Sequence, residues 1–152
     1  MTYLSIITNA AKVAHISVVL LYAICSHESR DFTLDFAEYD NGSPSFGVCQ
    51  IKEATAKMLG FKGNAMELRN AVISTKYAAL YLQYQLNRYN NNWCQAVAAY
   101  NAGSYLESEK KPGYPKNLRY VKLVQGKLRK DMQYRLECNK SNKYFIDNLK
   151  EE

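Results

Sequence analysis

Residues 24–30 read Ile-Cys-Ser-His-Glu-Ser-Arg and close an apolar run that begins at residue 16, "ISVVLLYAIC". Apolar residues recur at three- and four-residue spacing over residues 3–28, which predicts helix, divided in two near Thr8 or Asn9. The stretch 24–30 therefore gathers a thiol, an imidazole and a carboxyl group at the end of a predicted helix. Apolar surroundings disfavour the charged form of a carboxyl group. Glu28 is for this reason a candidate proton donor.

His27 is a weaker candidate than Glu28. Neighbouring residues on a helix point about 100° apart, so the two side chains do not share a face. No serine–histidine–acid or cysteine–histidine set can be assembled from the local spacing, and the chain has no Gly-x-Ser-x-Gly motif. We expect Ser26 and Ser29 to be helix-end or supporting groups.

The rest of the chain predicts a mainly helical protein. Residues 30–47, "RDFTLDFAEYDNGSPSFG", are rich in turn formers and predict a loop or a small β-hairpin. Further helices are expected from the segment 48–61, which should end near Gly60, and over 67–89, 93–103 and about 116–133. Without an internal repeat or a linker, the sequence predicts one domain over residues 1–152, all-α or mainly α with a minor β-hairpin.

Composition narrows the classes of function. Apolar residues make up 47% and charged residues 22%, as in ordinary soluble globular proteins. The four cysteines lack the spacing of a zinc site or a redox CxxC motif. Two disulfides in any of three pairings, or four free thiols, are equally compatible with them, and Cys25 and Cys94 are expected to be small core residues. Most of the 13 tyrosines are expected in the core, although tyrosine also suits sugar binding.

The formal net charge of +6 fits nucleic acid, an anionic cell envelope or solubility alone. The densest basic run, residues 127–130, comes without a nucleic-acid-binding signature, so we expect a solvated helix face and no nucleic-acid partner. The apolar run 16–25 is too short to span a bilayer and lacks the flanks of a signal peptide. We expect a buried helix, no stable membrane insertion, no export signal and a monomer.

Four blocks of sequence together resemble a known family. They are "SHES" (26–29), "SFGVCQI" (45–51), "AAYNAG" (98–103) and Tyr120-Val121 within "NLRYVKLV" (117–124). Their order and spacing resemble the catalytic domain of soluble-type lytic transglycosylases and the related goose-type lysozymes, over residues 15 to 125. The resemblance implies a lysozyme-like fold and cleavage of peptidoglycan glycan strands without metal or cofactor. The tail 134–152 lies outside it, and an extra helix there is expected, anchored by Leu136, Phe145, Ile146 and Leu149.

The resemblance also assigns roles to residues. Glu28 would be the general acid and later the general base. Residues 47–51 would form one wall of the sugar cleft, with Gly47 allowing close approach and Cys49 replacing the usual methionine. The remaining polar contacts would come from Gln50, from either Ser43 or Ser45, from Tyr100 and Asn101 on the opposite wall, and from Tyr120, which would hydrogen-bond toward Glu28. Core packing is the competing interpretation of the two tyrosines.

The acids between residues 28 and 47 decide the reaction. Cleavage falls between N-acetylmuramic acid and N-acetylglucosamine, and a hydrolase would need a second carboxylate to place water. Asp31, Asp35, Glu38 and Asp40 are the candidates, and Asp40 either plays that part or forms an Asp-Asn-Gly turn. We predict lytic transglycosylation with a 1,6-anhydro product, and the alternatives are a goose-type hydrolase and a non-catalytic glycan-binding domain. Delivery to the wall would be by phage lysis, by a virion or by a dedicated secretion machine.

Overall fold

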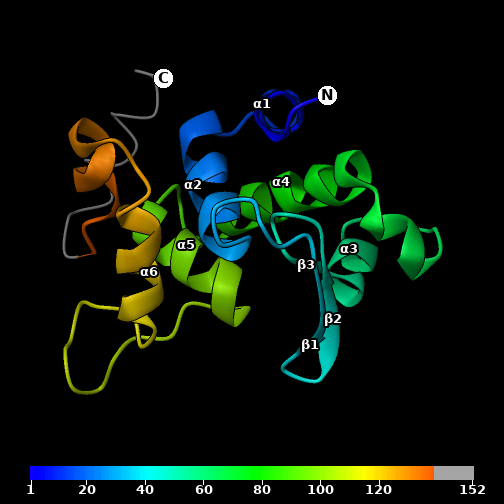
Figure 1. The fold of residues 1–152 in the computed structure, drawn as a ribbon. Coiled ribbons are helices and arrows are strands. Elements are labelled where there is room, and N and C mark those ends of the chain that lie inside the picture. Colours follow the sequence, from blue (N-terminus) through cyan, green and yellow to red (C-terminus); the bar gives the residue numbers. More distant parts are fainter. Residues whose placement is uncertain (139–152) are drawn as a thin grey trace. The chain divides into compact units, whose positions relative to one another are not determined.

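The computed structural model describes residues 1–138 of the chain. The described chain divides into two compact units, Met1–Tyr81 and a second that begins at Leu82, and the boundary falls inside helix α4 (Ala71–Arg88). Helices dominate, and one small three-stranded antiparallel sheet lies in the first unit (Figure 1). The predicted mainly helical class with a minor β-hairpin is confirmed. The organisation as one domain over residues 1–152 stays a prediction.

Two helices open the first unit, α1 (Tyr3–Ala14) and α2 (Val18–Glu28), and they pack against each other. The predicted division near Thr8 or Asn9 is wrong. The chain breaks later, because His15 adopts a left-handed conformation (φ 56°) that ends α1, and the Ser17 hydroxyl accepts a hydrogen bond from the Leu20 amide at 3.0 Å to begin α2. Most of α2 from Leu20 to Ser26 is buried.

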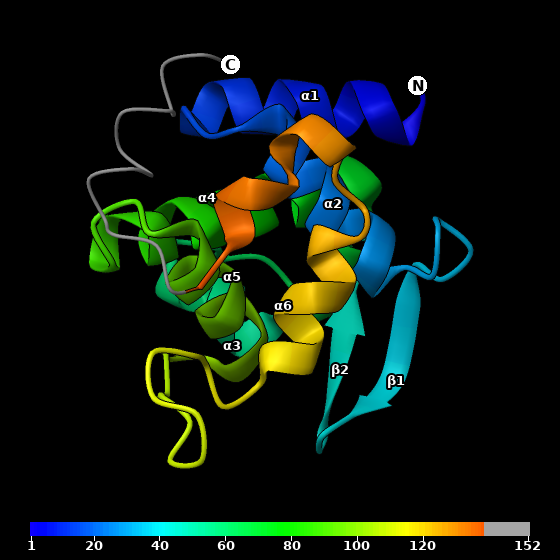
Figure 2. The same cartoon turned by 90° about the vertical axis from the view of Figure 1, so that its left-hand side faces the viewer.

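The predicted hairpin is present. Strand β1 (Phe36–Asp40) pairs antiparallel with β2 (Ser43–Phe46), and β2 pairs with the short β3 (Ile51–Lys52). The two residues between β1 and β2, Asn41 and Gly42, both have positive φ, 53° and 92°. That is the two-residue turn that matches the twist of antiparallel strands, and Asn-Gly is its preferred sequence. Figure 2 shows the hairpin that β1 and β2 form.

The helices after the sheet begin and end where side chains cap them. Helix α3 (Glu53–Met58) ends just before Gly60, as expected. Leu68 lies in a separate 3₁₀ turn, η1 (Ala65–Arg69), so α4 begins later than the predicted residue 67. The Asn70 side chain accepts hydrogen bonds from the Val72 and Ile73 amides at 2.9 and 3.2 Å, which sets the start of α4.

The second unit is helical. Helix α5 (Trp93–Ala102) agrees with the predicted span, beginning after Asn92, whose side chain accepts from the Gln95 amide at 3.0 Å. Helix α6 (Leu118–Gln125) packs on α5 and ends at Gly126, so the predicted single helix over 116–133 is wrong. The chain instead folds back, because the Gln125 Nε2 group donates to the Gln133 carbonyl at 2.7 Å.

A 3₁₀ helix, η2 (Lys130–Leu136), follows and contacts both α5 and α6. Its last residue, Leu136, is buried, as expected for an anchor of the tail. The other expected anchors, Phe145, Ile146 and Leu149, lie outside the described residues.

All four cysteines are paired, Cys25 with Cys49 and Cys94 with Cys138. Each disulfide lies within one unit. Cys25 and Cys94 are buried as predicted, but as half-cystines and not as thiols. Among residues 1–138, no helix is long and apolar enough to cross a bilayer.

Gly47, directly after β2, permits a close contact with α4. Its φ is 75°, and a Cβ atom placed on it would lie 2.8 Å from the Ser74 Cβ and closer still to the Ser74 hydroxyl. Gly42 also has a positive φ, but a Cβ atom there would meet nothing within 4 Å.

We therefore expect Gly47→Ala to lower the free energy of unfolding by about 2–4 kcal/mol, through overpacking together with the left-handed backbone. Gly42→Ala is the matched control and should cost only the backbone term, about 1–2 kcal/mol. Urea denaturation of both variants measures the difference. Equal losses would contradict the proposed clash with Ser74.

Candidate active site

Glu28 is the last residue of α2 and its side chain is half-buried. The next residue, Ser29, is fully buried and ends the helix: its hydroxyl donates to the Cys25 carbonyl at 2.7 Å and accepts from the Phe32 amide at 2.7 Å. Residues 30–32 all have left-handed φ angles between 51° and 65°. The chain after Glu28 thus turns sharply, and the buried serine holds the helix end in place.

A second serine braces the same turn. The Ser26 hydroxyl donates to Asp31 Oδ1 at 2.9 Å, and the Asp31 amide donates to the Ser26 carbonyl at 2.8 Å. The predicted helix-end role of Ser26 and Ser29 is confirmed. Asp31, one of the four candidate second acids, takes part in this helix-end network.

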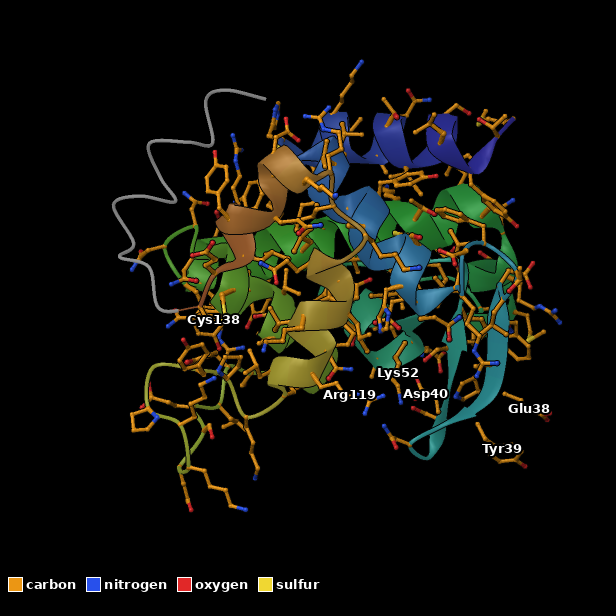
Figure 3. All side chains as sticks on the ribbon, turned by 60° about the vertical axis from the view of Figure 1, so that its left-hand side comes forward. Glu38, Tyr39, Asp40, Lys52, Arg119 and Cys138 are labelled. Atoms are coloured by element: carbon orange, nitrogen blue, oxygen red, sulfur yellow. A yellow bond between two sulfur atoms is a disulfide. The ribbon has the colours of Figure 1, made fainter. Side chains whose placement is uncertain are left out.

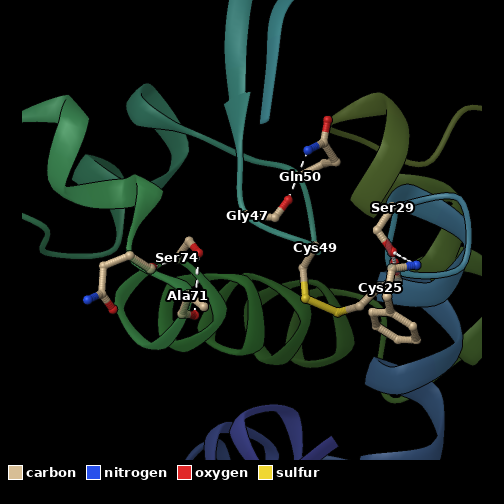
Figure 4. The surroundings of a disulfide bond; sticks show 9 residues. Cys25, Ser29, Gly47, Cys49, Gln50, Ala71 and Ser74 are labelled. Atoms are coloured by element: carbon tan, nitrogen blue, oxygen red, sulfur yellow. Dashed lines mark hydrogen bonds between the residues drawn. A yellow bond between two sulfur atoms is a disulfide. The ribbon is translucent and has the colours of Figure 1, made fainter. Parts of the chain in front are cut away.

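The segment after β2 is covalently attached to α2 (Figure 4). Cys49 is bonded to Cys25, and their Cα atoms are 4.1 Å apart. Glu28 lies three residues after Cys25 and Gln50 directly follows Cys49, so the Cα atoms of Glu28 and Gln50 are within about 13 Å of each other. The expectation that Cys49 contacts the sugar in place of a methionine is wrong, since its sulfur is bonded to α2 and the residue is 1% exposed.

Gln50 has an unusual backbone for a residue of its type, with φ at 53°. Its amide N–H and its side-chain Nε2 both donate to the Gly47 carbonyl, at 3.1 and 2.9 Å. Positive φ in a non-glycine residue is uncommon and clusters at functional sites. Gly47 itself was expected to admit substrate, and the structure shows that the group facing its missing Cβ is Ser74.

The two candidate serines both lie on β2 but have different surroundings. Ser45 is fully buried, and its hydroxyl donates to Asp40 Oδ2 at 2.6 Å. Ser43 is exposed and accepts from Lys52 Nζ at 3.0 Å, and the same ammonium donates to the main-chain carbonyl of Asp40. Figure 3 shows Lys52 beside Asp40, with Glu38 and Tyr39 pointing outward from β1. Asp40 is therefore bound into the hairpin at both its carboxylate and its backbone.

The second unit carries the other predicted residues on two packed helices. Tyr100 and Asn101 lie on α5, and Tyr120 lies on α6. The tyrosines are only 7% and 9% exposed, whereas Asn101 is exposed. Asn117, which the sequence did not single out, joins the helices: its Nδ2 group donates to Asn101 Oδ1 and to the Ala98 carbonyl, both at 3.0 Å. Asn117 directly precedes α6, whereas the sequence placed it inside the helix predicted over about 116–133.

The end of α5 is fixed from the same unit. Gln85 is fully buried, and its Nε2 group donates to the Gly103 carbonyl at 3.1 Å. The Arg88 guanidinium donates to the same carbonyl at 2.9 Å. Tyr105 lies two residues after Gly103, and its pKa is raised, mainly by burial and also by the negative charge of Glu107. A hydrogen bond with the Gln95 side chain partly opposes this rise. The Tyr105 phenol therefore stays protonated at neutral pH.

Within residues 1–138, no group of three or more His, Cys, Asp or Glu side chains is placed so that it could hold a metal ion.

Comparison with known proteins identifies the family. The family model described as "Transglycosylase SLT domain" matches residues 5–118, well over half of the chain. The chain belongs to the transglycosylase SLT domain family. Curated relatives include Protein IpgF of Shigella sonnei and of Shigella flexneri, each 33% identical over 93 residues. The match covers 60% of this chain and 60% of each relative, so the SLT domain chain spans only part of the relatives' length.

A solved structure shares the fold. It is an inactive mutant of the lytic transglycosylase Slt from Pseudomonas aeruginosa, in which a glutamate is replaced by glutamine. The two structures superpose with a TM-score of 0.57 at 19% sequence identity, covering 89% of this chain and 22% of that one. The likeness confirms the predicted lysozyme-like fold.

The two hairpin serines should respond differently to substitution. Ser45→Ala removes the buried donor to Asp40, and we expect a loss of about 1–2 kcal/mol in the free energy of unfolding. Ser43→Ala, the control, should change that free energy by less than about 0.5 kcal/mol, because the hydroxyl is at the surface. Chemical denaturation with amide exchange on the hairpin would measure both. A stable Ser45→Ala variant would show that the bond to Asp40 does not hold the hairpin.

Proposed function

We propose that this SLT domain cleaves the β-1,4 bond between N-acetylmuramic acid and N-acetylglucosamine in peptidoglycan by lytic transglycosylation. The observation that carries the proposal is Glu28, a half-buried carboxyl group at a braced helix end, linked through Cys25–Cys49 to Gln50. Family membership supports peptidoglycan as the substrate. That a glutamate-to-glutamine mutant of Slt is inactive supports a glutamate as the essential acid.

Glu28 alone supplies the acid–base chemistry in this mechanism. As a carboxylic acid it donates its proton to the glycosidic oxygen, and the bond from that oxygen to the anomeric carbon of N-acetylmuramic acid breaks. The neighbouring N-acetyl group assists departure. The Glu28 carboxylate then accepts the proton of the sugar's own 6-hydroxyl, whose oxygen bonds to the anomeric carbon. The product is a 1,6-anhydro sugar, and no water is consumed.

The contacts to substrate follow from the accessible polar groups. Gln50 and Ser43 are the residues of the first unit to which we assign sugar contacts. Ser43 is preferred over Ser45 because Ser45 is buried and bonded to Asp40. The assignment of Tyr100, Asn101 and Tyr120 to substrate binding stays a prediction.

The bonding of Asp40 supports transglycosylation over hydrolysis. An inverting hydrolase needs a second carboxylate that holds the attacking water. Asp40 Oδ2 accepts the Ser45 hydroxyl and Asp40 pairs with Ser43 beside the hairpin turn, so this carboxylate has a structural role in the hairpin. A goose-type hydrolase with Asp40 placing water is the alternative, and the mass of the product distinguishes the two.

Both disulfides support action outside the cytoplasm, because such bonds persist in oxidising compartments. A wall-degrading enzyme meets its substrate there. Delivery by a virion, by phage lysis or by a secretion machine remains a prediction from the sequence.

Glu28→Gln should abolish glycan cleavage. The amide keeps the size of the side chain but cannot donate the proton, so we expect release of soluble muropeptides from purified sacculi to fall by at least about 100-fold. Glu67→Gln, an exposed change of the same kind in η1, should release muropeptides at the wild-type rate.

Mass spectrometry of the released sugars identifies the reaction. Anhydro products support the transglycosylase, and products heavier by one water support the hydrolase. Wild-type protein that releases nothing would overturn both, and a fully active Glu28→Gln variant would overturn the assignment of the acid.

The net charge supports an electrostatic contribution to wall binding. Residues 1–81 contain seven basic and seven acidic residues, whereas residues 82–138 contain ten basic and four acidic. Nine of the basic residues in that second range are exposed: Arg88, Lys110, Lys111, Lys116, Arg119, Lys122, Lys127, Arg129 and Lys130. We infer that the second unit is attracted to the anionic cell envelope.

Removing charge from the second unit should therefore weaken binding to sacculi. We expect Lys127→Gln/Lys130→Gln to bind less well than wild type at about 50 mM salt, and the difference to shrink at about 300 mM as screening grows. Lys12→Gln/Lys62→Gln lowers the net charge equally in the first unit and should bind like wild type. Co-sedimentation with sacculi measures binding. Equal effects of the two double variants, or binding independent of salt, would contradict the inference.

A further inference from the structure

The Cys25–Cys49 disulfide joins the two segments to which the proposed mechanism assigns its acid and an amide. Cys25 is one helical turn before Glu28, and i, i+3 residues lie on neighbouring positions of a helix surface. Cys49 directly precedes Gln50. Both half-cystines are buried, at 0% and 1% exposure, so the bond itself is shielded from solvent.

The segment that carries Gln50 is an irregular turn and not a strand or a helix. Residues 47–50 lie between β2 and β3 and have no strand partners of their own. The Gly47 amide donates to the Asp35 carbonyl at 2.7 Å, and the Gln50 amide donates to the Gly47 carbonyl at 3.1 Å. Gln50 also holds a left-handed conformation that surrounding structure must maintain. The bond from Cys49 to Cys25 adds a covalent constraint from the helix that ends at Glu28.

We propose that Cys25 and Cys49 are positioning residues, and that their disulfide holds the Gln50 segment against the Glu28 helix in the geometry that cleavage requires. The inference rests on the proposed function. It further implies that glycan cleavage depends on oxidation. Two thiols and a disulfide of an exchange partner yield the Cys25–Cys49 bond and two partner thiols. The constrained site then forms in an oxidising compartment and is loosened where thiols stay reduced.

The competing explanation is that the bond only stabilises the fold. The second disulfide provides a comparison, because it closes a longer stretch of chain, with a separation of 44 residues against 24. Loop-closure entropy predicts equal or greater stabilisation from the longer loop. Cys94–Cys138, in the other unit, is near neither Glu28 nor Gln50 in sequence. A pure stability role predicts that removing either bond affects activity alike.

The test compares Cys25→Ala/Cys49→Ala with Cys94→Ala/Cys138→Ala in the full chain, at a temperature where circular dichroism shows both folded. With soluble glycan strands as substrate, we expect kcat of the first variant to fall at least tenfold, with KM changed less than threefold. The second variant should keep kcat within twofold of wild type, even where its Tm is lower. Equal kcat losses in both, or wild-type kcat in the first, would overturn the proposal.

A redox titration covers the case in which the first variant does not fold. The Cys94→Ala/Cys138→Ala variant contains only Cys25 and Cys49, so dithiothreitol acts on one bond. We expect kcat to fall at least tenfold on reduction and to return with oxidised glutathione, at unchanged helicity. A reduced form that stays fully active, or that loses helicity and activity together, would overturn the positioning role. Inactivity of the oxidised wild type would instead overturn the proposed function itself.

Discussion

The covalent bond between Cys25 and Cys49 is the constraint on which the arrangement of the first unit depends. Helix α2 is a rigid, largely buried element, but the chain that leaves β2 is not regular structure. The disulfide holds the Cα atoms of Cys25 and Cys49 4.1 Å apart, and so limits the distance between Glu28 at the helix end and Gln50 in the loop. A non-covalent methionine contact at position 49, which the family resemblance leads one to expect, would pack the same segments without fixing their separation.

Short polar contacts maintain the irregular segments around this bond. Buried Ser29 and Ser26 hold the turn after Glu28, and the Ser45–Asp40 pair holds the hairpin. Glycine at position 47 lets α4 approach at Ser74. These groups explain why carboxylates close in sequence differ in role: Asp31 and Asp40 accept hydroxyl donors within local turns, while Glu28 lies at a helix end with the chain turned away from it.

The two units also differ in composition. The first is electrically balanced and holds the sheet, the Glu28 helix end and the Gly47–Gln50 segment. The second carries the excess of positive charge on exposed side chains, and its helices α5 and α6 bear largely buried tyrosines. We assign the acid to the first unit and electrostatic attraction to the second. This division fits an enzyme that acts on a large anionic polymer.

The sequence by itself determined those features that depend on neighbouring residues. The turn formers of residues 30–47 predicted a loop or a hairpin, and Asn41-Gly42 is a pair that readily accepts the two positive φ angles of a hairpin turn. The stretch 93–103, closed by Gly103, predicted α5, and the four blocks together predicted the family, with Glu28 as the candidate acid. Helix ends were less predictable: the left-handed His15 and the fold-back after Gln125 depend on caps that propensity does not show.

Only the tertiary structure decided the pairing of the cysteines, the burial of Ser45 and the neighbour of Gly47. Each depends on segments that meet in space although 24 or more residues separate them in the chain, or on which face of a strand is covered. Periodicity describes the surface of one element but not the element packed against it. For that reason Glu28 could be proposed as the acid from sequence, whereas the disulfide that joins its helix to the segment 47–50 could not.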